Sequence, residues 1–177
     1  MKNLMLTNAV PDDLDTIRNI YWELLDSSEE YASILRWKKN IYPADEDWLS
    51  YVAEGEMYLI WDAGNLIGAA ALAKSQPEDY RKVRWTVDAR DDEVAVVHLL
   101  AIRPQYQGQG YATAALHELV RLAEKLGKKA LRLDAIGTNK PAQKLYEKFG
   151  FVNCGTEQLD YESTGLTKFV FYELRLA

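Results

Sequence analysis

Six residues near the middle of the chain, Gln105 to Gly110, have the composition of an anion-binding loop. They read Gln-Tyr-Gln-Gly-Gln-Gly and follow an apolar, β-branched run that stops at Arg103-Pro104. An amphipathic helix is expected directly after Gly110, so the order is strand, glycine loop and helix. Backbone N–H groups in the first turn of a helix have no intrahelical partner and lie at the positive end of the helix dipole. This stretch therefore predicts a site for a phosphate group.

Two known kinds of phosphate loop fit this stretch poorly, and a plain strand-to-helix turn stays an alternative. A Walker-type loop needs Lys followed by Ser or Thr after its last glycine, and Tyr111-Ala112 stands there instead. A dinucleotide fingerprint fits better, but its third small position holds Thr113 and no strand–helix–strand unit precedes the loop. That alternative predicts affinity for NAD or FAD and none for coenzyme A.

The elements around the loop are those of an α/β (α+β) fold, with a mixed sheet in a single domain that spans residues 1–177. Helices are expected where apolar residues recur every three or four positions, and strands where they alternate or run together. The expected helices cover residues 11–24, 28–39, 44–54, 111–126 and 139–149. The expected strands cover residues 5–7, 56–61, 66–72, 83–87, 93–102, 130–135, 151–155 and 166–174.

The bulk composition narrows the possible partners. The chain of 177 residues has a net charge of −6 and a pI near 5.0. Nucleic acid and anionic membranes are therefore not expected as partners, because both need a basic face. No apolar run approaches the roughly 20 residues of a membrane span, and no signal-peptide core follows the N-terminus, so a cytoplasmic location is expected. The single cysteine, Cys154, allows no intrachain disulfide, and we expect no metal site.

Two motifs together resemble a known family. Gln105, Gly108 and Gly110 fill the pattern Gln/Arg-x-x-Gly-x-Gly/Ala, which is motif A of the GCN5-related N-acetyltransferase (GNAT) superfamily. About thirty residues downstream, the segment 139–151 is similar to motif B of the same superfamily. The resemblance covers residues 93–151, and the expected elements before it also suit the family. It implies a central, mostly antiparallel, splayed sheet flanked by helices.

The resemblance implies that the chain binds an acyl-coenzyme A, usually acetyl-CoA, and transfers its acyl group to an amine. Backbone N–H groups from Gln107 to Thr113 would hold the pyrophosphate at the helix N-terminus. The amide-containing pantetheine arm would pair like an extra strand with Leu100–Ile102, and Asn139 would hydrogen-bond the arm from the opposite side. The residues expected to bind the donor are Leu100, Ala101, Ile102, Gln107, Gly108, Gln109, Gly110, Tyr111, Ala112, Thr113 and Asn139.

Acyl transfer from a thioester to an amine needs an oxyanion donor, an acid and a base. The backbone N–H of Leu100 or Ala101 is the expected oxyanion donor. The resemblance gives Tyr146 the role of the acid that protonates the leaving thiolate. The alternative for Tyr146 is a buried tyrosine whose hydroxyl has a structural partner.

The base is not assigned by the resemblance, because the position where the family often has a glutamate holds Val96. Strand alternation predicts that His98 lies on the same face as Val96 and Leu100. An imidazole, with an ordinary pKa of about 6.5, suits a base, and a packed core histidine is the alternative. We therefore predict that His98 touches the acceptor site, with Glu93 and Asp134 as weaker candidates for the base.

The acceptor is expected to be an amine of a small molecule or a protein, and no motif identifies it. Segments 20–60, 75–92 and 155–166 should shape its site. Most aromatic residues of the first segment are expected to pack on the sheet, with a minority lining a pocket. A non-catalytic acyl-CoA-binding or sensory module is the alternative, which the missing strand glutamate favours. A homodimer is compatible with the resemblance, because the last strands of such folds often pair or exchange.

Overall fold

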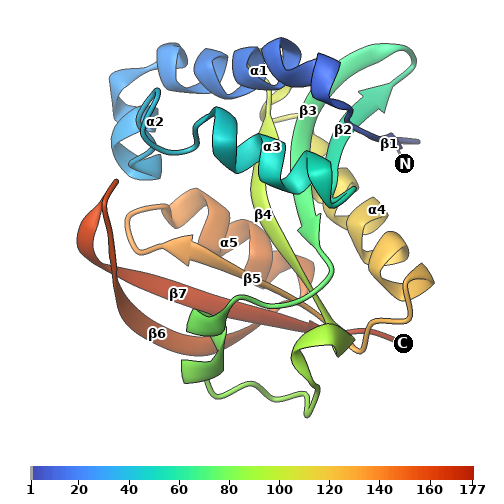
Figure 1. The fold of residues 1–177 in the computed structure, drawn as a ribbon, viewed down its shortest axis with the longest axis vertical. Helices are drawn as coiled ribbons and strands as arrows, with labels where there is room; N and C mark the ends of the chain where they lie inside the picture. Colours follow the sequence, from blue (N-terminus) through green and yellow to red (C-terminus); the bar gives the residue numbers. More distant parts are fainter. Residues whose placement is uncertain (1) are drawn as a thin grey trace.

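The computed structural model describes residues 2–177 and contains one seven-stranded sheet with helices on both faces (Figure 1). The strand order is β1-β2-β3-β4-β5-β7-β6. Neighbouring strands are antiparallel except β4 and β5, which are parallel. The mostly antiparallel α/β fold is thus confirmed. The strands are β1 (Met5–Asn8), β2 (Met57–Asp62), β3 (Asn65–Ala73), β4 (Val94–Ile102), β5 (Ala130–Ile136), β6 (Val152–Tyr161) and β7 (Gly165–Arg175).

Five helices cover the sheet. Helices α1 and α3 pack on the face formed by β2, β3 and the end of β4, and α2 follows α1 on that side (Figure 1). Helices α4 and α5 pack on the opposite face. None of the helices in residues 2–177 is long and apolar enough to cross a membrane. The helices are α1 (Leu14–Ser27), α2 (Glu29–Leu35), α3 (Asp45–Ala53), α4 (Tyr111–Lys125) and α5 (Lys140–Phe149), with 3₁₀ turns at Pro11–Asp13, Glu78–Lys82, Asp91–Glu93 and Pro104–Tyr106.

Helices α4 and α5 form where the sequence predicts them. On the apolar stripe of α4, Leu116 and Leu119 are completely buried against the sheet. Helix α5 begins where the Asn139 carboxamide oxygen accepts a hydrogen bond from the Ala142 N–H (3.2 Å). It ends at Gly150, whose φ of 115° suits a residue without a Cβ. Both helices are therefore fixed by local signals at their ends and by one buried face.

The parallel strands β4 and β5 pair over only three residues each. Val94, Ala95 and Val96 lie opposite Ala130, Leu131 and Arg132, and no pairing follows beyond them. From that point the two strands separate, while each keeps its other neighbour. The sheet is consequently split where the C-terminal parts of β4 and β5 run side by side without pairing, as the resemblance implied.

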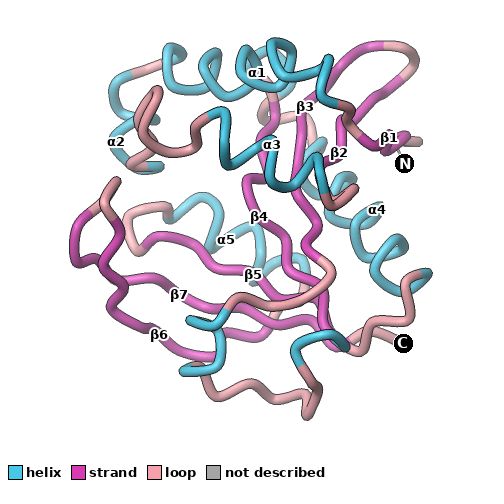
Figure 2. The backbone as a smooth tube through the Cα atoms, viewed as in Figure 1, coloured by secondary structure: helices cyan, strands magenta, loops and turns pink. Residues whose placement is uncertain are grey.

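One expected strand is absent. Residues 83–87 form an irregular segment of the connection between β3 and β4, which Figure 2 draws mostly as loop. The N–H groups of Thr86 and Val87 donate to the carboxylate of Glu173 (2.8 and 3.0 Å) instead of to a neighbouring strand. The apolar spacing of this segment reflects side chains that insert into the core, such as Val83 and Val87.

Two expected boundaries were also wrong. Helix α2 ends at Leu35, several residues before the expected end at residue 39, because Arg36 adopts a left-handed conformation with φ 56°. Strand β6 continues to Tyr161, where the sequence predicted an end at residue 155. Its outer residues are exposed and polar, so the apolar pattern stops before the backbone pairing with β7 does.

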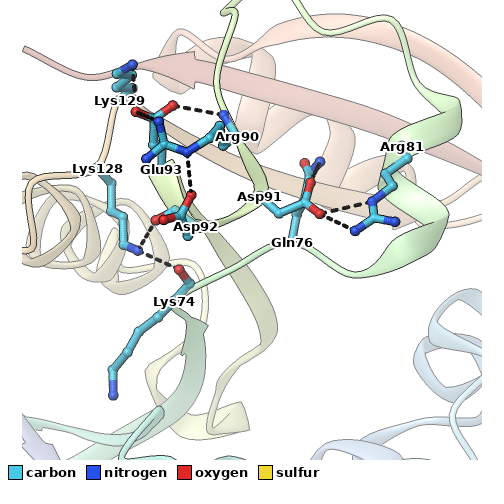
Figure 3. A network of polar contacts seen from close by, with 9 residues as sticks. All are labelled: Lys74, Gln76, Arg81, Arg90, Asp91, Asp92, Glu93, Lys128 and Lys129. Atoms are coloured by element: carbon cyan, nitrogen blue, oxygen red, sulfur yellow. Dashed lines mark hydrogen bonds and ion pairs between the residues drawn. The ribbon is translucent and has the colours of Figure 1, made fainter.

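The connection between β3 and β4 is held to the rest of the fold by polar contacts near the start of β4 (Figure 3). The Lys128 ammonium donates to the backbone carbonyls of Lys74 and Asp92, and burial lowers the pKa of Lys128. The Asp91 carboxylate accepts from Gln76 (2.8 Å) and Arg81 (2.9 Å). The ion pair with Arg81 lowers the pKa of Asp91. These contacts fix both ends of the connection.

A buried ion pair holds the middle of the same connection. Arg132 on β5 donates from Nε to Glu173 on β7 (2.8 Å), and both side chains are only 1% exposed. The other polar atoms of the pair bond to residues of the connection between β3 and β4. Arg132 donates to Gln76 and to the carbonyl of Val87. Glu173 also accepts from the Thr86 hydroxyl. The pair is therefore fully hydrogen-bonded in the interior.

Removing one member of this pair should be strongly destabilising. We expect Glu173→Leu to lower the free energy of unfolding by about 3–5 kcal/mol, because it leaves the Arg132 charge buried without a partner. Urea unfolding of the two proteins measures the difference. The control is Arg121→Gln, which breaks the exposed pair with Glu118 and should change stability by less than about 0.5 kcal/mol. A Glu173→Leu variant within about 1 kcal/mol of wild type would contradict the account.

Candidate active site

A cavity of about 850 Å³ opens where β4 and β5 separate. Residues from both strands, from the glycine loop and from α5 line one part of it. The other part is lined by residues of α2, the segment after it, α3, and the turn between β6 and β7. Of the predicted site residues, those that line the cavity are His98, Leu100, Ile102, Gln107, Gly108, Gly110, Tyr111, Ala112, Thr113, Asn139 and Tyr146. Ala101 and Gln109 do not line it.

The glycine loop offers a row of unused backbone donors to the cavity. Gly108 and Gly110 have φ values of 71° and 81°, which residues without a Cβ adopt at little cost. Within residues 2–177, the N–H groups from Gly108 to Thr113 have no protein acceptor; we call this row the amide cradle. Gln107 is outside the cradle, because its own N–H already donates to Pro104 (3.2 Å). The arrangement at the start of α4 is suited to an anion.

A bulge in β4 sets which side chains face the cavity. Leu99 has a φ of 56°, and Leu99 and Leu100 together lie opposite the single residue Ala70 on β3. The Tyr21 hydroxyl on α1 donates to the carbonyl of Leu99 (2.6 Å) and fixes the bulge. No local pattern predicts this role for Tyr21, because the contact joins residues far apart in the chain.

The prediction that His98 and Leu100 share one face of the sheet was wrong, and the bulge is the reason. Val96 and His98 lie on the same face, as expected, but Leu100 packs with the core under α4 on the opposite face. The simple alternation of side chains therefore fails between His98 and Leu100, because one extra residue moves every following side chain to the other face of the sheet.

The Tyr146 side chain is buried on α5 and faces the cavity. Its ring packs against Phe151 and Tyr172, with centroid distances of 5.9 and 5.7 Å. Among the described residues its hydroxyl has no hydrogen-bond partner, so the alternative of a structurally paired tyrosine is not what the fold contains. Burial raises the pKa of Tyr146, which keeps the hydroxyl protonated at neutral pH.

His98 and Asp134 line the cavity from the two separated strands, His98 from β4 and Asp134 from β5. Burial lowers the pKa of His98, and the negative charge of Asp134 partly opposes this. The Tyr80 hydroxyl donates to Asp134 (2.6 Å), and burial raises the pKa of that carboxyl. Glu93, by contrast, lies outside the cavity in ion pairs with Lys129 and Arg90.

Aromatic residues from the N-terminal helices form the far side of the cavity. We call Tyr31, Trp37, Ile41, Tyr42 and Tyr51 the aromatic wall. The four aromatic residues of this wall also pack against the core, so they combine the two roles that were expected of different residues. Trp48 belongs to the core alone, and it stacks on the buried Tyr21 with a centroid distance of 5.2 Å. Composition alone does not separate the two roles, because both need large apolar side chains.

The split between two parallel strands, with the amide cradle beside it, is the arrangement that the resemblance to the GNAT superfamily implied. The sequence model of the Acetyltransferase (GNAT) family matches residues 14–151. The chain belongs to this family. The dinucleotide-binding alternative is therefore wrong.

Known relatives agree with this assignment. An uncharacterized N-acetyltransferase of Methanocaldococcus jannaschii is 23% identical over 152 residues, which are 85% of this chain and 62% of that protein. The chain thus spans about three fifths of the length of this curated relative. A GNAT-family acetyltransferase from Streptococcus agalactiae has the same fold, with a TM-score of 0.82 and 22% identity over 98% of this chain and 96% of that one. A Salmonella typhimurium structure with its cofactor acetyl-CoA gives a TM-score of 0.67 and 17% identity over 99% and 95% of the two chains.

The Asp134 carboxyl should reduce the stability of the fold at neutral pH. Its pKa is raised in the folded state, so the folded chain holds the proton more tightly than the unfolded chain does. The stability from that proton is present at low pH and is lost as the pH rises through the folded-state pKa. Asp134→Asn keeps an acceptor for Tyr80 and carries no charge. We expect its Tm to exceed that of wild type at about pH 8 and the difference to shrink toward about pH 4.

Differential scanning calorimetry at the two pH values measures this difference, and each kcal/mol corresponds to about 2–4 °C for a chain of this size. Asp160→Asn, on the exposed side of β6, is the control and should leave Tm unchanged. A lower Tm for Asp134→Asn than for wild type at the higher pH would show that the carboxylate stabilises the fold.

Proposed function

We propose that this chain is an N-acetyltransferase that moves the acetyl group of acetyl-CoA to a primary amine. One observation carries the proposal: a single cavity joins the amide cradle to the unpaired Tyr146 hydroxyl. The cradle suits a pyrophosphate, and the hydroxyl suits a thiolate that must be protonated. A binding module would need the first of these features and has no use for the second.

The donor would lie in the split between the strands. Its pyrophosphate would accept hydrogen bonds from the amide cradle, Gly108–Thr113. Its pantetheine arm would follow Leu100–Ile102, where β4 has lost its partner β5, and pair with the free backbone groups there. Asn139 would contribute only its amide nitrogen, because its carboxamide oxygen is already the cap of α5.

The reaction needs a neutral amine to attack the thioester carbonyl. The C–N bond forms, the C–S bond breaks, and the backbone N–H of Leu100, which lines the cavity, stabilises the oxyanion in between. Tyr146 gives its proton to the leaving thiolate, so coenzyme A leaves as a thiol. The ammonium proton passes to a base and then to water, and the tyrosine recovers a proton from solvent.

His98 is the base that the geometry favours. Its lowered pKa keeps the imidazole neutral at physiological pH, and a neutral imidazole can accept a proton. It also stands on the β4 face that turns away from α4, next to the aromatic wall through Tyr51 (centroid distance 5.8 Å). A His98→Asn variant with the wild-type kcat would remove His98 from this role.

Binding and turnover of acetyl-CoA test the proposal as a whole. We expect calorimetry to detect acetyl-CoA binding, and a thiol reagent to detect coenzyme A release when primary amines are added. Gly110→Val should weaken acetyl-CoA binding by about 10-fold or more, because a β-branched residue is strained at φ 81° and its side chain would disturb the cradle.

Gly127→Val is the matched control for the glycine variant. Gly127 also has a positive φ, 72°, but it lies at the opposite end of α4, so acetyl-CoA affinity should stay unchanged. Binding without thiol release for any amine would favour the non-catalytic module. Absence of acetyl-CoA binding would refute the proposal.

Tyr146→Phe tests the acid directly. We expect kcat to fall by about 10²–10⁴-fold, the usual contribution of a positioned acid, with acetyl-CoA affinity nearly unchanged. Steady-state kinetics and calorimetry measure the two quantities. Tyr172→Phe is the control, since this neighbouring tyrosine packs on Tyr146 and hydrogen-bonds Glu147 (3.0 Å) without lining the cavity. A large loss of affinity with an unchanged kcat in Tyr146→Phe would show a binding role instead.

A further inference from the structure

We propose that the acceptor is a compact primary amine with an aromatic or alkyl body and no acidic group, and that Asp134 holds its ammonium. This inference rests on the proposed acetyl transfer and names the substrate class of the same site. Three independent features carry it: the charge of the cavity lining, the apolar wall, and the contacts that join α2 to β7 and to the end of β5 beside the cavity.

The lining of the cavity is uniformly uncharged or acidic. Among the residues that the structure describes, none of those lining the cavity is Lys or Arg, and two, Asp134 and Glu162, are carboxylic acids. A carboxylate or phosphonate on the acceptor would be buried here without a cationic partner and next to Asp134. Burying an unpaired charge is strongly unfavourable, so an amino acid or a phosphorylated amine is a poor fit.

Asp134 is prepared to receive a cation. Tyr80 holds one carboxylate oxygen (2.6 Å), while the other has no partner among the described residues. Tyr42, Tyr51 and Tyr161 line the same cavity; burial raises the pKa of each phenol, and the charge of Asp134 raises it further. An ammonium group between a carboxylate and aromatic rings gains from both.

The body of the acceptor would rest on the aromatic wall. Its members Tyr31, Trp37, Ile41, Tyr42 and Tyr51 present rings and an aliphatic side chain, with hydroxyl groups as the only polar atoms of the tyrosines. Burial of apolar surface against such a wall is favourable. An aromatic or alkyl amine uses this surface, whereas a strongly polar amine does not.

Contacts between α2 and the strands beyond the split limit the size of the acceptor. The Arg36 guanidinium donates to the Thr167 hydroxyl on β7 (3.0 Å), and the Thr138 hydroxyl donates to the carbonyl of Ile34 (2.9 Å). In Figure 1 the turn between β6 and β7 rises to meet α2. These bridges join α2 to the far half of the sheet beside the cavity and limit the room there for a polypeptide, which favours a compact molecule over a protein N-terminus.

Matched pairs of acceptors test the substrate class. Tyramine and tyrosine share one body and differ by the carboxylate, as do phenethylamine and phenylalanine. With acetyl-CoA as donor, we expect kcat/KM to be about 100-fold or more higher for each amine than for its amino acid. A short peptide with a free N-terminal alanine should be acetylated no better than the amino acids.

The Asp134→Asn variant tests the ammonium site. It should raise KM for tyramine by about 10-fold or more without changing the affinity for acetyl-CoA, because the charge-assisted contact is lost and the donor site is untouched. Its thermal unfolding checks that it is folded. Asp160→Asn, exposed on β6 and outside the cavity, should keep the wild-type KM.

The possible results distinguish failure of the proposed acceptor class from failure of the proposed acetyl transfer. Absence of acetyl-CoA binding refutes the proposed function. If acetyl-CoA binds, then equal or better use of tyrosine, phenylalanine or the peptide overturns the inference while acetyl transfer stands. Bound acetyl-CoA with no transfer to either amine, or an unchanged KM in Asp134→Asn, also overturns the inference.

Discussion

The parallel pairing of β4 and β5 covers three residues on each strand. The residue at which this pairing ends decides where the cavity opens and which backbone and side-chain groups face it. Beyond Val96 and Arg132 the two strands separate, so their inner backbone groups face the cavity without each other as partners. Buried backbone donors and acceptors rarely stay unpaired in proteins. The split is therefore a place where an extended, amide-containing molecule can take the position of a missing strand, and the amide cradle lies at one end of it.

The fold maintains this split with contacts on both sides of it. On β4, Tyr21 fixes the carbonyl of the bulged Leu99, which turns His98 and Leu100 to opposite faces. On β5, the last paired residue, Arg132, is buried in its ion pair with Glu173. That pair holds the connection between β3 and β4, and the same connection supplies Tyr80, which orients Asp134. Stability of the core and orientation of the candidate ammonium site are thus linked through one segment.

Local patterns were enough to predict the elements that form the candidate donor half of the site. The glycine loop, the start of α4 and the Asn139 cap of α5 depend on neighbouring residues, and a sequence motif records such short-range geometry. Tyr146 could be placed for the same reason, because its position on α5 follows from helical spacing after Asn139.

The acceptor half depends on contacts between residues far apart in the chain. The bulge at Leu99 needs Tyr21, the irregular segment 83–87 needs Glu173, and Asp134 gains its setting from Tyr80. No local pattern encodes these contacts, which explains why simple alternation misplaced Leu100 and why Asp134 stood only as a weaker candidate. A single acidic residue near the end of the apolar strand 130–135 was the one signal available.

We propose above all that the split between β4 and β5 is the donor site, and a crystal structure with coenzyme A bound is the decisive test. We expect the pyrophosphate on the N–H groups of Gly108–Thr113, the pantetheine arm between the strands, and the sulfur within hydrogen-bond reach of the Tyr146 hydroxyl. Coenzyme A bound outside the split, or with its sulfur remote from Tyr146, would overturn this proposal.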